Sequence, residues 1–185
     1  MNFNDLAWSD PGGFWFSEAV RPFWFRSTPA FDAEVRRRFL GTWEAAAGGR
    51  LDDWSDTPAG ALALVIVLDQ FPLNMFRGEA RSFSTEARAR EVAAEAIDRG
   101  WDRELEDAAK AFLYLPFMHS EAVADQDRAV ELYRDAGLED SLRWARHHRE
   151  IIRRFGRFPH RNAALGREST REEREWLGSK EAFRG

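Results

Sequence analysis

The chain has no cysteine among its 185 residues, so it can form neither disulfide bonds nor cysteine metal sites, and it has no thiolate nucleophile. Lysine is almost absent, because 25 of the 27 basic residues are arginine. No segment alternates apolar and polar residues at period two, which argues against β-strands. No basic start followed by an apolar block marks a signal peptide, and we therefore expect a soluble, cytoplasmic protein.

Apolar and aromatic side chains, by contrast, are abundant. Hydrophobic residues make up 44% of the sequence and aromatic residues 14%, including 8 tryptophans and 15 phenylalanines. This composition argues against disorder and predicts a core rich in rings. The length is that of one ordinary domain, so we expect residues 1–185 to form a single unit with a loose tail from residue 178.

The net charge of −5 hides an asymmetry along the chain. The segment 143–167 contains eight arginines and one acid, a charge of +7, so the rest of the chain carries −12. The segment 121–140 holds seven acids and two arginines, and we expect the two segments to form helices that pair by charge. The alternative is that the arginines bind carboxylates or phosphates, which suit the guanidinium fork. The acidic remainder argues against nucleic acid as a partner.

The organising element is the segment 57–78, TPAGALALVIVLDQFPLNMFRG. Residues 61–68 are all apolar, and a helix without a polar face has to be buried by its neighbours. Thr57 is a suitable N-cap and Pro58 suits a first helical turn. The apolar run is about half the length that a bilayer span needs, so we expect no membrane partner.

This apolar run ends abruptly in Asp69 and Gln70, so the helix carries a carboxylate and an amide to its own C-terminal end. Pro72 follows, and we expect it to stop regular hydrogen bonding there. A buried rod with a polar tip can organise a fold and seat a site.

Helical spacing and stop signals predict the remaining elements. An aromatic segment, 14–25, is expected to dock its rings on the core through a short helix. Asp32 is the predicted N-cap of the next helix, and Pro116 is the predicted end of a later one. The further helices are expected over 32–47, from Ser84 or Thr85 to 100, over 105–115, over 120–136, over 138–155, and after Ser169 or Thr170. The sequence therefore predicts an all-α single domain of about seven or eight helices in antiparallel pairs around the buried central helix.

Three polar clusters interrupt the apolar helices, each at a predicted helix end, where backbone groups are unpaired and sites are easily built. The first is Asp69, Gln70, Asn74 and Arg77; the second is His119, Ser120 and Glu121; the third is Arg157, His160, Arg161, Asn162 and Arg167. The third cluster could clamp a carboxylate or phosphate. Alternatively, its arginines reach the acidic helix and the carbonyls where the preceding helix ends.

The histidines and serines allow several interpretations. His148 lies on an apolar helical stripe and is expected to face inward, either as a core histidine with its hydrogen bonds satisfied or as a group that orients an acid such as Asp69. The spacing of His119, His148 and His160 matches no metal-ligand signature, so no metal site is predicted. Ser120 and Ser169 are better explained as N-caps than as nucleophiles, because no nucleophile elbow surrounds either.

Four segments carry a resemblance to a known family: DQFPLNMFRG (69–78), FLYLPFMHSE (112–121), ADQDRAV (124–130) and RFGRFPHRNAALGREST (154–170). They resemble the bacterial family called domain of unknown function 924, over about residues 14–177. The resemblance implies an all-helical, tetratricopeptide-repeat-like superhelical fold, but no reaction. Carried onto this chain, the recurrent polar positions of the family are Asp69, Gln70, Asn74, Arg77, His119, Ser120, Glu121, Asp125, Gln126, His148, Arg157, His160, Arg161, Asn162, Gly166, Arg167 and Ser169. Ala122 departs from the pattern, since the family often has an acid there.

The leading hypothesis for function is a site, binding or enzymatic, for a small anionic ligand between the three clusters. Arg77, Arg161 and Arg167 would hold the anion, and His119 or His160 would transfer a proton with Glu121 or Asp69 orienting it. The candidate ligand-binding set is completed by Gln70, Asn74, His148, Arg157 and Asn162. The alternative is a module without catalysis that receives a peptide or protein partner in an aromatic groove formed by 14–25. The sequence names no cofactor and no oligomeric state.

Overall fold

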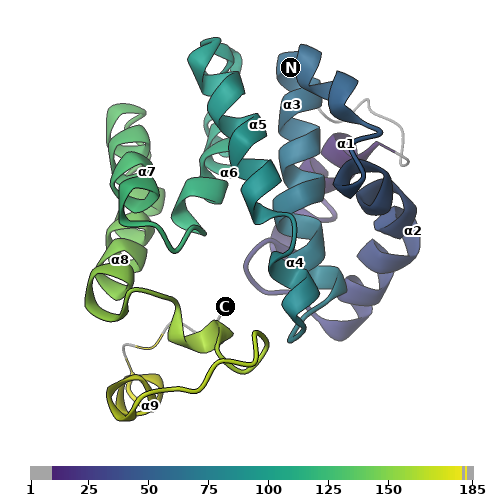
Figure 1. The fold of residues 1–185 in the computed structure, drawn as a ribbon. Coiled ribbons are helices and arrows are strands. Elements are labelled where there is room, and N and C mark those ends of the chain that lie inside the picture. The colour runs from purple at the N-terminus through teal and green to yellow at the C-terminus, as the bar shows by residue number, and fades with distance from the viewer. Residues whose placement is uncertain (1–9, 181, 183–185) are drawn as a thin grey trace.

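The computed structural model describes residues 10–180 and 182, and within these residues every regular element is a helix (Figure 1). The α-helices are α1 (Pro11–Phe16), α2 (Pro29–Ala47), α3 (Pro58–Val65), α4 (Phe71–Met75), α5 (Glu86–Asp98), α6 (Asp107–Met118), α7 (Val123–Asp135), α8 (Glu139–Phe155) and α9 (Arg171–Leu177). A π-helical turn, Ile66–Gln70, joins α3 to α4 without a break, so these nine segments make eight rods. The predicted all-α fold of seven or eight helices is confirmed; the repeat-like superhelical arrangement stays a prediction.

The rod from α3 to α4 forms the middle of the core. Every residue from 61 to 72 is buried, as expected for a helix without a polar face. The hydroxyl of Thr57 accepts a hydrogen bond from the amide of Gly60, which confirms the predicted N-cap. By length and composition alone Pro58–Met75 could cross a membrane, with a mean hydropathy of 1.3, but 78% of it is buried inside the fold. It is therefore the core helix of a compact domain.

The prediction that Pro72 ends this rod is wrong, because the rod continues through α4. Proline has no N–H to donate to the carbonyl of Leu68. The hydroxyl of Thr85, expected to cap α5, donates to that carbonyl instead at 2.5 Å, and accepts a bond from the Trp43 indole at 3.2 Å. The amide of Phe71 reaches back five residues, which makes the turn π-helical. A tertiary contact thus satisfies the group that the proline leaves free.

Three predicted helix boundaries also change. The N-cap of α2 is Thr28, not Asp32, which lies in the first turn of that helix. Pro116 lies inside α6, close enough to its end that few helical hydrogen bonds are affected. The next helix begins at Val123 rather than at Ser120, whose hydroxyl accepts a hydrogen bond from the amide of Ala122 in the preceding turn.

The aromatic segment is mostly part of the core. Phe14, Trp15 and Phe16 are buried, and the rings of Trp15 and Phe16 each meet Phe112 edge to face with centroids 5.6 Å apart. This confirms that the segment docks on the core. Phe25, at 81% exposure, is the one large exposed ring among residues 14–25, and it still stacks on Phe112 with centroids 6.2 Å apart. An aromatic groove built from these rings therefore has little exposed surface to offer.

Helices α5 to α8 follow one another across the molecule as packed neighbours (Figure 1). The acidic helix α7 pairs with the arginine-rich α8, as predicted: Asp127 accepts hydrogen bonds from Arg149 at 3.3 Å and from Arg153 at 2.8 Å. Helix α8 ends at Gly156, whose φ of 69° is a left-handed conformation that glycine adopts without strain.

Beyond α8, the chain forms a short 3-10 turn, Pro159–Arg161, and then α9, which together lie below the helical row in Figure 1. The predicted capping box is present at the start of α9, between Thr170 and Glu173. A small apolar cluster, separate from the main core, joins this segment to α8: it consists of Ile151 and Ile152 of α8 with Phe158 and Trp176. Residues 156–177, which we call the C-terminal segment, are held to the rest of the fold by this cluster and by ion pairs to α8, to α5 and to Glu121.

Candidate functional site

A buried carboxylate from the middle of the central rod meets a histidine at the C-terminal end of α6. Asp69, in the π-helical turn, is fully buried, and its two oxygens lie 2.9 and 3.1 Å from Nδ1 of His119, the residue that caps α6. The amide nitrogen of Gln70 donates to the same carboxylate at 2.5 Å. The His119 side chain keeps 15% of its surface exposed. With Nδ1 directed at the carboxylate, Nε2 is the nitrogen left for a ligand, and no residue in the described part of the chain bonds to it.

The electrostatic surroundings of His119 favour its protonated form. Burial lowers the pKa of the imidazole, but the charge and hydrogen bond of Asp69, together with the charge of Glu86, outweigh burial and raise the pKa above its ordinary value. A histidine whose Nδ1 is held by a carboxylate and whose Nε2 is free is the usual arrangement of a general acid–base group. We call Asp69 and His119 the dyad.

A second buried pair lies beside the dyad. Glu86, the first residue of α5, accepts a hydrogen bond from Nη1 of Arg161 at 3.0 Å. The Arg161 guanidinium lies over two rings, 4.5 Å from the centroid of Phe83 and 4.6 Å from that of Phe158. Arg161 is only 5% exposed. Two aromatic faces and one carboxylate thus fix the plane and position of this cation.

This second pair is only partly satisfied. Nε of Arg161 and Oε1 of Glu86 are buried and have no hydrogen-bond partner among the described residues. Burial raises the pKa of Glu86, as does the charge of Asp69, and the charges of Arg161 and His119 do not fully compensate. A buried donor or acceptor without a partner costs about 1–3 kcal/mol, so a ligand that supplies one would be favoured.

The dyad and the second pair belong to one cluster, since their charges act on one another. His160, from the same 3-10 turn as Arg161, also lies near them. Burial lowers the pKa of His160 to about 4, helped by the positive charges of Arg161 and His119, so this imidazole is neutral near pH 7. The fold therefore brings together residues from all three polar clusters of the sequence.

His148 is buried next to this cluster but serves packing. Its Nδ1 lies 2.9 Å from the carbonyl of Trp144, one turn earlier in α8, and its ring meets Phe158 at 5.5 Å with an interplanar angle of 72°. Burial lowers the pKa of His148 to about 3. The geometry agrees with a core histidine that faces inward, as expected, and its Nδ1 is directed at a backbone carbonyl rather than at Asp69.

Arg77 and Asn74, from the first polar cluster, bond to residues near the start of α2 and not to the dyad. Nε of Arg77 lies 2.8 Å from Asp32 Oδ2, and its Nη2 lies 3.3 Å from Oδ1. The amide of Asn74 donates to the same carboxylate at 2.7 Å and to the hydroxyl of Ser27 at 3.0 Å. These contacts tie α4 to the start of α2, away from the dyad, so Asp32 works as a tertiary anchor.

Glu121, a predicted catalytic residue, is occupied by the C-terminal segment. Its two oxygens form a bidentate pair with Arg167 at 2.7 and 2.9 Å, and Oε1 also accepts the amide of Phe158 at 2.8 Å. Burial raises the pKa of Glu121, but the hydrogen bonds from Arg167 and Phe158 outweigh burial and lower it. A carboxylate so engaged is a poor proton-transfer group, and its contacts fasten residues 158–167 to the end of α6.

Arg157 and Asn162 stabilise the C-terminal segment from within. Nε and Nη2 of Arg157 lie 2.7 and 2.9 Å from the two oxygens of Glu173 in α9. The amide of Asn162 donates to Ser169 at 3.1 Å, and its oxygen accepts Nε of Arg167 at 3.0 Å. For these two residues the contacts agree with the structural alternative for the third cluster.

The residue that sequence reasoning missed is Glu86. An acid in the first turn of a helix is favoured by the helix dipole in any protein, so its presence after Thr85 carried no signal of a site. Its partner, Arg161, lies 75 residues later. Only the tertiary fold shows that the two meet.

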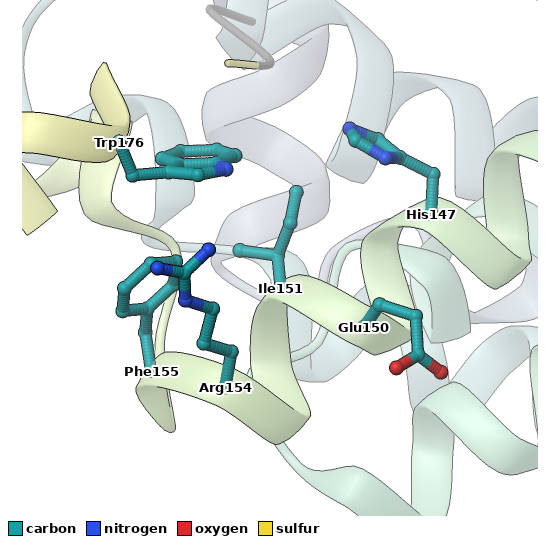
Figure 2. A pocket seen from close by; sticks show the side chains of 6 residues that line it. All are labelled: His147, Glu150, Ile151, Arg154, Phe155 and Trp176. Carbon is teal, nitrogen blue, oxygen red and sulfur yellow. The ribbon is translucent and has the colours of Figure 1, made fainter. Parts of the chain in front are cut away.

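A separate shallow cavity of about 200 Å³ lies between α8 and α9 (Figure 2). In Figure 2, Trp176 and His147 stand on either side of Ile151, while the Glu150 carboxylate points away. Its lining residues are His147, Glu150, Ile151, Arg154, Phe155 and Trp176. It includes none of the dyad or Glu86–Arg161, and we place the candidate site at the charged cluster because the unsatisfied buried groups are there. In the described part of the chain, no three histidines or acids form a group that could hold a metal ion.

Comparison with known proteins supports the resemblance seen in the sequence. A solved structure described as a protein of unknown function from Agrobacterium tumefaciens is 43% identical, with a TM-score of 0.85, over 92% of this chain and 96% of that chain. No curated protein matches the chain. The family model described as "Bacterial protein of unknown function (DUF924)" matches residues 12–181. The chain therefore belongs to this bacterial family.

Proposed function

We propose that the protein binds a small anionic ligand at Arg161 and exchanges a proton with it through His119. The observation that carries this proposal is a buried Asp–His dyad next to a buried arginine that keeps an unpaired nitrogen. Proton transfer needs a titrating group with one free nitrogen, and ligand binding needs a fixed partner beside it. The dyad supplies the first and Arg161 the second.

Comparison of the four candidate arginines supports the choice of Arg161. Arg77 and Arg157 each use Nε and Nη2 on one carboxylate, and Arg167 uses all three guanidinium nitrogens. Arg161 uses only Nη1, which leaves Nε without a partner within the described residues. The Nε edge of a guanidinium is a good binding edge for a carboxylate or phosphate. Arg161 is therefore the anion-binding residue of the proposal, and the other three arginines stabilise the fold.

Asp69 orients the imidazole of His119 and stabilises its charged form, as the raised pKa of His119 indicates. The ligand meets Nε2, which acts as an acid when the imidazole is charged and as a base when it is neutral. His160, neutral near pH 7, offers a hydrogen bond to the ligand rather than a proton. Glu121 has no part in the chemistry of this proposal, because Arg167 and a backbone amide occupy it.

The binding half of the proposal is tested with a thermal-shift screen of anionic metabolites. A ligand that binds only the folded state at a hundredfold excess over its dissociation constant stabilises that state by about 2.7 kcal/mol. We expect a selective rise in melting temperature that Arg161→Lys abolishes, because an ammonium group has no planar edge. Arg77→Lys is the matched control, since Arg77 is bonded to Asp32 away from the dyad. Equal shifts for wild type and Arg161→Lys would refute the anion site.

The catalytic half of the proposal is tested with any ligand from the screen that the protein also converts to a product. We expect His119→Asn to lower kcat by roughly 10²- to 10⁴-fold while binding persists, because asparagine can still donate to Asp69 but cannot transfer a proton. His147→Asn, which removes the imidazole that lines the separate cavity, should leave turnover unchanged. Unchanged turnover in His119→Asn excludes His119 as the proton-transfer group.

A further inference from the structure

The charges around Arg161 bear on which anion the site accepts. Two carboxylates, Asp69 and Glu86, face two cations, Arg161 and His119, in one largely buried cluster. These groups come from the π-helical turn, from α5, from the 3-10 turn and from the end of α6. The cluster is therefore close to neutral before a ligand enters, and a buried site tolerates additional unpaired charge poorly.

A ligand anion bound to the Arg161 guanidinium lies next to the Glu86 carboxylate, because Glu86 is already bonded to that guanidinium. One Glu86 oxygen takes Nη1 of Arg161 at 3.0 Å, while the other has no hydrogen-bond partner in the described part of the chain. An anion that bonds to Nε of Arg161 shares this cation with a carboxylate already in place. A single added negative charge can be met by Arg161 and protonated His119 together; a second has no further cation within this cluster.

This inference rests on the proposed anion site. We propose that the part of the ligand that binds Arg161 is a singly charged carboxylate, and that Glu86 makes the site reject a doubly charged phosphate. Glu86 is then a specificity-determining residue that acts through charge. With an effective dielectric constant near 20, one more unit charge within about 6 Å of Glu86 changes affinity by at least roughly tenfold. The hydrogen bond from Arg161 to Glu86 also shows that a carboxylate fits against this guanidinium.

The experiment compares three probes that each carry one methyl group: acetate, methanesulfonate and methyl phosphate. They separate charge from shape, because methanesulfonate is tetrahedral like the phosphate but singly charged like acetate. Titrations near pH 7, about one unit above the second phosphate pKa of about 6, keep most of the methyl phosphate doubly charged, and they stay close to the pH range in which His119, whose pKa is raised, is protonated. Binding is followed through the Nε–H resonance of Arg161 in the NMR spectrum, which Arg161→Lys identifies by its loss.

For wild type we expect acetate and methanesulfonate to bind with similar strength and methyl phosphate at least tenfold more weakly. Glu86→Gln removes the charge but keeps an oxygen for Arg161, so methyl phosphate should gain at least tenfold relative to acetate. The matched control is Glu91→Gln, an exposed acid on α5 that pairs with Arg88. It should leave all three affinities unchanged.

Two different results would separate this inference from the proposed function. If the probes move the Arg161 resonance but wild type binds methyl phosphate as tightly as acetate, charge selection by Glu86 is refuted while the anion site stands. The same holds if Glu86→Gln leaves the ratio of affinities unchanged. If no probe moves the resonance, the proposed anion site fails, and its selectivity with it. The wild-type comparison decides the question even where Glu86→Gln does not fold.

Discussion

Mild acid should destabilise this fold through its buried neutral histidines, and His148 is the clearest case. Burial lowers its pKa from 6.5 to about 3 in the folded state. At pH values between these two, the unfolded chain binds a proton that the native state does not. Stability therefore falls as pH falls through 6.5, and the loss continues until the folded pKa is reached.

The magnitude follows from the unfolded pKa alone. Because pH 5 lies about 1.5 units below 6.5 and well above the folded pKa, His148 should cost about 2 kcal/mol of unfolding free energy at pH 5 relative to pH 7. His160, with a pKa lowered to about 4, adds a loss of the same sign. His119 has a raised pKa, so its contribution is complete below 6.5 and is lost as pH rises through its folded pKa.

A comparison of wild type with His148→Gln cancels the contributions of the other titrating groups, because both proteins contain them. Urea denaturation, followed by tryptophan fluorescence, gives the unfolding free energy of both proteins at the two pH values. The variant should lose about 2 kcal/mol less than wild type between pH 7 and pH 5. Ile152→Val, a buried substitution on the same helix without a titrating group, controls for lowered stability and should keep the full wild-type loss. An equal loss in wild type and His148→Gln would contradict the assignment of a buried neutral imidazole.

Three further substitutions test other parts of the argument by the same denaturation assay. Thr85→Val leaves the Leu68 carbonyl unbonded and should cost about 1–3 kcal/mol; a smaller cost means that another donor replaces the hydroxyl. Glu121→Gln should cost about 1–3 kcal/mol at neutral pH by breaking the pair with Arg167. Since the Glu121 pKa is lowered, this difference should shrink as pH falls through its folded pKa, and a pH-independent difference would argue against the pair. Phe25→Ser should change stability by less than about 0.5 kcal/mol, because this ring is 81% exposed.

Several elements could be predicted because their signals are local. An apolar run without a polar face has to be buried, and threonine before proline caps the helix that follows, so the central rod was evident. The capping box of Thr170 and Glu173 and the left-handed Gly156 likewise depend on residues a few positions apart. Signals of this kind do not depend on the rest of the fold.

Proline was the local signal that misled. Pro72 removes one donor from the rod, and sequence alone predicted that the helix stops there. The helix continues because Thr85, distant in the chain, donates to the carbonyl that the proline leaves free. Whether a proline ends a helix thus depends on what surrounds it.

The sequence by itself determined the helical class, the family, and the three polar clusters that interrupt the apolar helices. Only the tertiary structure decided how these clusters are used: it joined His119 to Asp69 across 50 residues and Arg161 to Glu86 across 75, and it occupied Arg77, Arg157 and Arg167 with acids. The physical reason is range. Helix formation and capping involve neighbours within a turn, whereas the choice of ion-pair partner depends on which side chains the packing of distant helices brings within a few ångströms.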